Sequence, residues 1–260
     1  MLNILRNNIP DGFQRILIEI WGLSEFAERY FKEVFKPPYE IKELIRQFFQ
    51  VGNKSLGLVG ITGFIIGFVL ALQAIPTLKP FGATSLIPAM ISISIIREIG
   101  PVITGLICAG KIGSGIGAEL GSMKVTEQID AMEVSACNPF KFLVVTRVTA
   151  TTLMIPLLII YADAIALVGG YVAMSIVSDL SISLYFSQIF DALGFMDIIP
   201  ATIKTFFFGF TIGLVGCYKG YNADRGTESV GIAANTSVVI SSLMVIIWDM
   251  LAVQITNILS

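Results

Sequence analysis

The chain has 260 residues, of which 55% are hydrophobic and 14% are charged, and its formal net charge is −2. Soluble domains carry about 25% charged residues, so much of this surface cannot face water. The charge gives no sign of nucleic-acid binding. Histidine is absent and the three cysteines are far apart, so we expect no metal site, no disulfide framework and no histidine-based catalysis.

Residues 12–36 predict an amphipathic helix, because apolar side chains recur at helical spacing and charged ones fill much of the other arc. The segment is too polar to span a membrane, and Trp21 and several phenylalanines beside basic residues favour a helix lying in the membrane interface. A helix in a soluble bundle is the alternative, but the chain offers no soluble core for it to join. Pro37 and Pro38 end this helix. A shorter amphipathic piece follows, so the predicted interfacial segment covers residues 12–52.

Five apolar stretches come next, each long enough to cross a bilayer, which takes roughly 20 helical residues. They cover residues 55–78, 84–109, 142–178, 198–218 and 233–258. The predicted fold class is all-α: a single domain over 1–260 with five transmembrane helices, an N-terminal interfacial helix and a cytoplasmic coupling helix. The first and fourth spans contain GxxxG patterns, Gly63–Gly67 and Gly209–Gly213, which predict close helix contacts.

The basic residues orient these spans. Eight lysines and arginines precede residue 55, the connection between the first two spans holds only Lys79, and residues 179–197 hold none. Cytoplasmic loops carry the excess of basic residues in membrane proteins. The pattern therefore predicts a cytoplasmic N-terminus and a C-terminus on the outer side.

The cytoplasmic segment 111–139 is too long for a turn and too polar to span. We predict a helix over Ala118–Val134 that docks onto a soluble partner, since an acidic stripe argues against a helix resting on the negative inner leaflet. The candidate partner-binding residues are Glu119, Lys124, Glu127, Asp130 and Glu133. The preceding Gly105–Ile112 nearly matches a phosphate-binding loop, but Ile112 cannot ligate magnesium, so we expect no nucleotide site.

Arg97 and Glu98 lie in the middle of the second span. A charge at mid-membrane costs about 2.5–3.5 kcal/mol on insertion scales, so such residues usually face a cavity or a partner. A structural ion pair of Arg97 with Glu98 or Asp249 is the alternative. Asp163, Lys204 and Asp249 present the same choice, although Lys204 and Asp249 could also extend to an interface.

The stretch IIREIGPVITGLICAGKIGSGIGAELGSMKVTEQIDAMEVSACNP, at residues 95–139, resembles the signature region of the MlaE/YrbE permeases. The later CYKGYNADRGTESVGIAANTSVV resembles the same family's loop before its last span. The likeness extends over essentially the whole chain.

This resemblance implies an ABC transporter permease that acts as a homodimer, with two cytoplasmic ATPase subunits, an MCE-domain protein outside and a possible small cytoplasmic regulatory subunit. It implies phospholipid as cargo, moved between the inner and outer membranes of diderm bacteria, with the plastid envelope as the alternative location. It also implies a transport subunit that is not an enzyme and holds no cofactor. By similarity, the lipid cavity matches Leu70, Leu78, Phe81, Arg97, Glu98 and Val102.

Three other classes of function compete with this interpretation. An ion-coupled secondary transporter would be expected to show inverted repeats and interrupted helices in matching halves, and five spans without visible repeats argue against it. A membrane scaffold would give no reason for charges at mid-span. A membrane enzyme would need a nucleophile–base or metal constellation, and none is visible.

Overall fold

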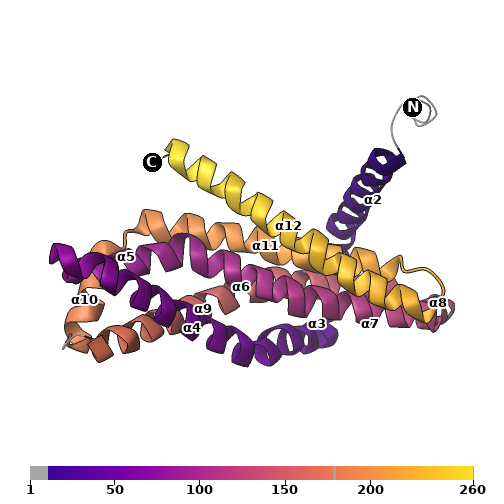
Figure 1. The fold of residues 1–260 in the computed structure, drawn as a ribbon. Helices are drawn as coiled ribbons and strands as arrows, with labels where there is room; N and C mark the ends of the chain where they lie inside the picture. The colour runs from indigo at the N-terminus through magenta and orange to yellow at the C-terminus, as the bar shows by residue number, and fades with distance from the viewer. Residues whose placement is uncertain (1–10, 178–179, 260) are drawn as a thin grey trace.

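The computed structural model describes residues 11–177 and 180–259, and all the regular structure in these residues is helical (Figure 1). Short π-helical or 3-10 segments interrupt several rods. The α-helices are α2 (Asp11–Val34), α3 (Ile41–Phe48), α4 (Lys54–Leu78), α5 (Ile87–Ser94), α6 (Gly100–Cys108), α7 (Ser114–Val125), α8 (Gln128–Val134), α9 (Thr146–Val177), α10 (Ile182–Ala192), α11 (Phe195–Tyr221) and α12 (Thr227–Leu259).

Five helical rods are long and apolar enough to cross a membrane, as predicted. They cover Ile41–Phe81, Thr84–Val125, Phe140–Val177, Phe195–Tyr221 and Thr227–Thr256. The first rod includes the second amphipathic piece, because the π-helical Phe49–Asn53 joins α3 to α4 without a break. Residue 178, the predicted end of the third span, lies outside the described residues.

The predicted amphipathic helix is present as α2, which stands at an angle to the bundle (Figure 1). Its Phe26 and Tyr30 are buried, and Phe26 packs edge-on against Phe140 and Tyr218. Burial raises the pKa of the Tyr30 phenol, whose hydroxyl lies 3.0 Å from the Thr149 hydroxyl. The other face exposes apolar side chains, including Trp21, which is 73% exposed. Such a face suits the predicted position along the membrane surface.

Glycines bring α9 into backbone contact with two neighbours. A Cβ added at Gly63 or Gly67 of α4 would collide with the Ala162 or Ala166 carbonyl oxygen of α9. On the other side of α9, a Cβ at Gly209 would lie 2.6 Å from the Thr151 carbonyl oxygen. The GxxxG patterns therefore mark close helix contacts, as predicted.

The helix predicted over Ala118–Val134 is in fact two helices. The first, α7, continues the second span and buries Leu120 against α11 and α12. The chain then breaks at Glu127, whose φ of 58° lies in the left-handed region and cannot continue a right-handed helix. Only the short α8 beyond this break is a separate helix. Periodicity missed the break because the apolar spacing resumes in α8, where Ile129 is buried.

A further helix, α10, lies in the connection between the third and fourth spans. Its Tyr185 and Ile189 are buried in a second apolar cluster together with Ile87 and Ile91 of α5. The Ser181 side chain caps its start by accepting a hydrogen bond from the Leu184 N–H at 3.3 Å. The helix thus covers one end of the bundle.

Candidate functional site

The second rod changes to π-helical geometry at Ile95–Ile99, the segment that carries Arg97 and Glu98. Single π-helical turns in α-helices frequently occur at functional sites. Pro101 lies four residues after Arg97 and has no N–H, so it cannot bond the Arg97 carbonyl oxygen as another helical residue would. The Lys204 Nζ donates to that oxygen at 2.6 Å. Pro101 thus leaves the Arg97 carbonyl oxygen free to accept a hydrogen bond from a side chain of another span.

Lys204 of α11 joins three spans. It is 4% exposed, and its ammonium also donates to Glu98 Oε2 at 3.2 Å and to Asp249 Oδ1 of α12 at 2.7 Å. An ammonium has three N–H donors, and each has an acceptor here. Lys204 and Asp249 therefore lie in an internal network and do not extend to an interface.

Arg97 pairs with Asp197, which stands near the start of α11. The other carboxylate oxygen of Asp197 accepts the Gly194 N–H at 2.8 Å and so caps α11. The partners expected for Arg97 from the sequence, Glu98 and Asp249, bind Lys204 instead. Because the Arg97 side chain remains 54% exposed, part of its guanidinium is open to a ligand.

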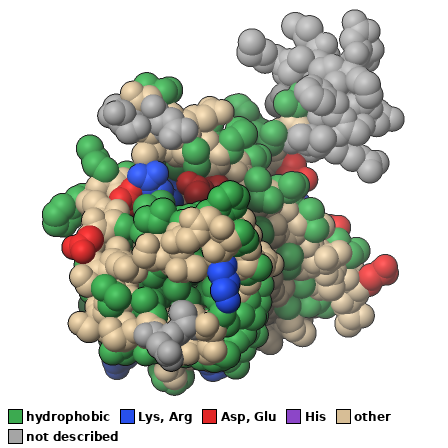
Figure 2. All heavy atoms as spheres, turned by 60° about the vertical axis from the view of Figure 1, so that its left-hand side comes forward, with side chains coloured by type: hydrophobic (Ala, Val, Ile, Leu, Met, Phe, Trp, Pro, Cys, Tyr) green, Lys and Arg blue, Asp and Glu red, His purple; other side chains and the backbone are tan. Residues whose placement is uncertain are grey.

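We call these five side chains the charged layer: Arg97, Glu98, Asp197, Lys204 and Asp249. A pocket of about 450 Å³ opens beside it between α11 and α12. Arg97 and Lys204 form its polar end, and the remaining lining is mostly apolar: Met196, Pro200, Ile203, Phe207, Trp248, Leu251, Ala252, Ile255 and Thr256. Figure 2 shows acidic and basic side chains together in a recess among hydrophobic ones. The arrangement suits a molecule with one charged end and an apolar body.

Asp163 of α9 lies on another side of the same layer. Its Oδ1 is buried and has no hydrogen-bond partner among the described residues. The carboxylate presses against Gly100, where an added Cβ would collide with it. A separate pocket of about 200 Å³ lies between Asp163, Pro101 and Thr205. Arg97, Lys204 and Asp249 thus lie with Glu98 in the charged layer. Asp163 lies nearby but takes no part in its hydrogen bonds.

The family of the chain follows from comparison with known proteins. The family model described as "Permease MlaE" matches residues 44–255. The chain belongs to the MlaE permease family. A probable ABC transporter permease protein of Rickettsia felis is 34% identical over 255 residues, which cover 98% of each chain. One from Rickettsia prowazekii is 37% identical over 238 residues, covering 92% of this chain and 91% of the relative.

A plant relative is similar as well. The Arabidopsis thaliana protein TRIGALACTOSYLDIACYLGLYCEROL 1, chloroplastic, is 27% identical over 253 residues, which cover 94% of this chain and 72% of the relative. From the family match and the Rickettsia relatives, this MlaE-family chain is an ABC transporter permease, a transport subunit and not an enzyme, and permeases of this class work with a separate ATPase subunit.

The residues predicted to line a lipid cavity do not all gather in this MlaE-family permease. Arg97 lines the pocket described above, and Glu98 joins the network beside it. Leu70 and Leu78 of α4 instead pack against the apolar cluster around Ile91, and Phe81 is 80% exposed. Val102 of α6 is half-buried. None of these last four residues lines the 450 Å³ pocket.

The contribution of α11 and α12 to this pocket was not predicted from the sequence. Met196, Pro200, Ile203 and Phe207 recur at spacings of three or four on α11, as do Trp248, Leu251 and Ile255 on α12. Such a stripe in an apolar span cannot be told apart from an ordinary packing face. The useful signal was the one charge within each predicted span, Lys204 in 198–218 and Asp249 in 233–258, because charges in spans face the bundle interior.

The predicted coupling residues separate into two groups. Glu127, Asp130 and Glu133 are exposed on or beside α8. Lys124 at the end of α7 binds Asp130 at 2.9 Å and so links the two helices. Glu119 differs, because it points back into the permease and pairs with the buried Arg147.

Proposed function

We propose that this chain is the membrane-spanning subunit of an ATP-driven phospholipid transporter and acts as a homodimer in a bacterial inner membrane. The observation that carries the proposal is the 450 Å³ pocket, apolar along α11 and α12 and charged at the end formed by Arg97 and Lys204. An anionic amphiphile matches that lining: its phosphate would lie at the guanidinium and its acyl chains along Phe207, Leu251 and Ile255.

Arg97 can serve a phosphate without giving up Asp197. Its Nε and one Nη bond the carboxylate, and a guanidinium has five N–H donors. The remaining donors can bond phosphate oxygens, a geometry that arginine matches better than lysine. In the proposed mechanism, Arg97 thus holds the head group while Lys204 fixes the helices around it.

The proposed homodimer rests on the exposure of α12. Its most apolar stretch has only 11% of its residues buried, and large side chains such as Val239, Leu243 and Ile246 are each at least half exposed. Figure 1 shows the C-terminal part of α12 leading away from the other spans. A two-chain lipid exceeds the drug-sized ligands that pockets of this volume hold. In the proposal, a second copy covers α12 and two pockets together enclose one lipid.

The proposed ATPase site is the exposed face of α8, and charge reversal tests it. Glu127→Lys with Asp130→Lys should release the ATPase while the permease stays folded in the membrane, as judged by co-purification and gel filtration. Glu228→Lys, at the start of α12, is the control on another exposed acidic residue. Unchanged co-purification and transport would defeat this assignment.

The proposed orientation places α2 and α8 in the cytoplasm and the MCE-domain partner on the opposite side. Glu25 is exposed on α2. A Glu25→Cys variant should react with a membrane-impermeant thiol reagent only when the reagent reaches the cytoplasm. Labelling from outside intact cells would show that the orientation is inverted. A small regulatory subunit, if present, would bind on the cytoplasmic side.

The decisive experiment is reconstitution with the ATPase in liposomes, followed by mass spectrometry of bound lipid. We expect ATP-dependent transfer of phospholipid and phospholipid in the purified complex. Transport by the permease alone, driven by an ion gradient, would support the secondary-transporter alternative. A complex that hydrolyses ATP but neither binds nor moves phospholipid would overturn the proposal.

A further inference from the structure

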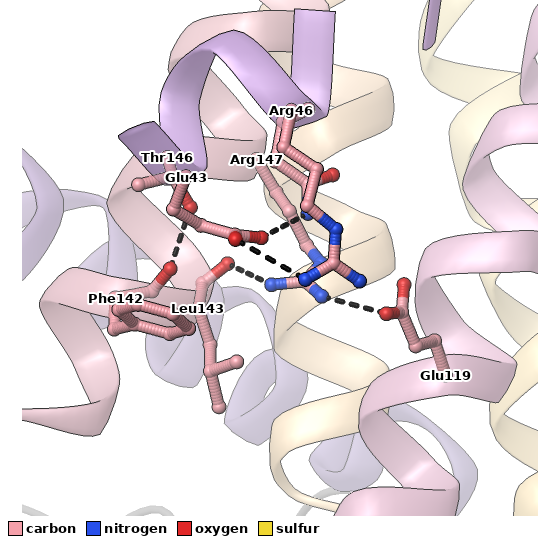
Figure 3. A network of polar contacts seen from close by, with 8 residues as sticks. Glu43, Arg46, Glu119, Phe142, Leu143, Thr146 and Arg147 are labelled. Carbon is pink, nitrogen blue, oxygen red and sulfur yellow. Dashed lines mark hydrogen bonds and ion pairs between the residues drawn. The ribbon is translucent and has the colours of Figure 1, made fainter. Parts of the chain in front are cut away.

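Arg147 is a buried cation that lies far along the bundle from the charged layer, near the start of α9. Its side chain is 3% exposed, and its Nη1 donates to the Leu143 carbonyl oxygen at 3.0 Å. Its Nη2 lies 2.9 Å from Glu119 Oε1 of α7 (Figure 3). Its Nε is buried and has no hydrogen-bond partner in the described part of the chain.

This ion pair links two rods that also touch each other beside the charged layer. Glu119 belongs to the rod Thr84–Val125, which carries Arg97 further along. Arg147 lies in the first turn of α9, the helix that carries Asp163, and Asp163 presses against Gly100 of the second rod. The two rods thus meet at a polar side-chain contact at one end and at the Asp163–Gly100 contact, beside the charged layer, at the other. A shift of one rod against the other at Glu119 would reach the layer.

The other contacts of α7 are apolar. It packs mainly against α11 and α12, and glycines let the backbones approach closely. A Cβ at Gly220 of α11 would lie 2.8 Å from the Gly117 carbonyl oxygen, and a Cβ at Gly117 would lie 2.7 Å from Ser237 Oγ. Beside these glycines, Ile116 and Leu120 of α7 pack over Gly216 and Gly220 of α11, so the contact is apolar. The Arg147–Glu119 pair supplies a fixed attachment to α9.

Stability alone does not explain this pair. A buried ion pair is often no more stable than apolar residues of similar volume. Glu119 is 40% exposed, so its carboxylate can turn to water while Arg147 cannot. Glu43 and Arg46 of α3, which pair with each other at 3.4 Å, lie close by in Figure 3. The cluster therefore also borders the helix that begins the first span.

We propose that Arg147 is a positioning residue that holds Glu119, and with it the segment leading to α8, in register with α9. A displacement of α8 by the ATPase then moves α9 and the second rod together and reaches the charged layer. The inference rests on the proposed ATP-driven function. It assigns Glu119 a role inside the permease, in contrast to the exposed Glu127 and Asp130.

The test measures ATP hydrolysis and phospholipid transfer separately in proteoliposomes that contain the complete complex. Glu119→Ala should leave complex assembly and ATP hydrolysis unchanged, while lipid moved per ATP falls by about tenfold, the size expected for losing one hydrogen bond to a charged group. A pair that only stabilised the fold would lower the yield and leave this ratio unchanged. Glu28→Ala is the matched control, because Glu28 pairs with Lys32 at 2.5 Å on the exposed face of α2.

A second variant separates contact with Arg147 from contact with the ATPase. Glu119→Gln combined with Arg147→Gln should lose no more coupling than either change alone, because each change removes the same Glu119–Arg147 interaction. Additive losses, or loss of the ATPase from the Glu119→Ala complex, would overturn the inference. So would an unchanged ratio in Glu119→Ala beside a wild type that transports normally. A wild-type complex that moves no lipid would instead overturn the proposed function together with this inference.

Discussion

Lys204 and Arg147 are both buried cations that join separate spans, but their surroundings differ. The Lys204 ammonium has an acceptor for each N–H, and two of these acceptors are carboxylates on other rods. Arg147 has one carboxylate partner, 40% exposed, and leaves its Nε unbonded among the described residues. Lys204 is the centre of a closed network that fixes helices in place. The Arg147 pair can open, because its Glu119 carboxylate can turn to water. The comparison predicts that removing Lys204 harms folding and that weakening the Arg147 link harms coupling.

The largest expected effect is that of Lys204→Met. It leaves Glu98 and Asp249 without their cation in a span, and removing one partner of a buried pair typically costs about 3–5 kcal/mol. We expect loss of folded protein, measured by gel filtration and thermal unfolding in detergent. Adding Glu98→Gln and Asp249→Asn should restore folding. A stable single variant would show that the network is not closed.

Arg147→Met should cost less, about 1.5–3 kcal/mol, which is the usual range for a hydrogen bond to a charged group. Glu119 can then turn to solvent, so no buried carboxylate is left alone. Thermal unfolding in the same detergent gives the comparison with Lys204→Met. An equal or larger loss of stability would contradict the distinction between the two cations.

Gly100→Ala tests the contact between the second rod and α9. Its Cβ would collide with Asp163 Oδ1 and lie 2.8 Å from the Ile95 carbonyl oxygen, so we expect about 1–3 kcal/mol of destabilisation from overpacking. Gly110→Ala is the control on the same rod, because nothing lies within 4 Å of its added Cβ. Combining Gly100→Ala with Asp163→Ala should recover part of the loss. Equal stability of both single variants would argue against this contact.

Arg97→Ala should have the smallest effect on stability, about 1 kcal/mol, because its side chain is half-exposed and exposed pairs contribute little. Asp197 keeps its hydrogen bond from the Gly194 N–H. Bound phospholipid and transport should nevertheless fall, as measured by mass spectrometry and lipid transfer. If assembly failed as in Lys204→Met, Arg97 would belong to the structural network. Normal lipid content and transport would leave it without either role.

The sequence by itself determined the number of spans, their GxxxG contacts and the family. Hydropathy over about 20 residues and glycine spacing are local properties, which the bilayer thickness and helix geometry convert directly into structure. The ends of the spans were harder to predict, because helices continue past the apolar stretch. The second rod extends to Val125, beyond the predicted end at residue 109. The break at Glu127 was equally hidden, since it depends on a single backbone conformation.

Only the tertiary structure decided which charges pair. Arg97 binds Asp197, one hundred residues away in sequence, while Lys204 takes both of the partners expected for Arg97. Glu119, a predicted ATPase contact, likewise pairs with Arg147, a partner that its sequence position did not indicate. Each pairing depends on how helices rotate and shift against one another, and close glycine contacts set those angles. Local sequence shows that a charge in a span must find a partner, but helix packing determines which partner lies within reach.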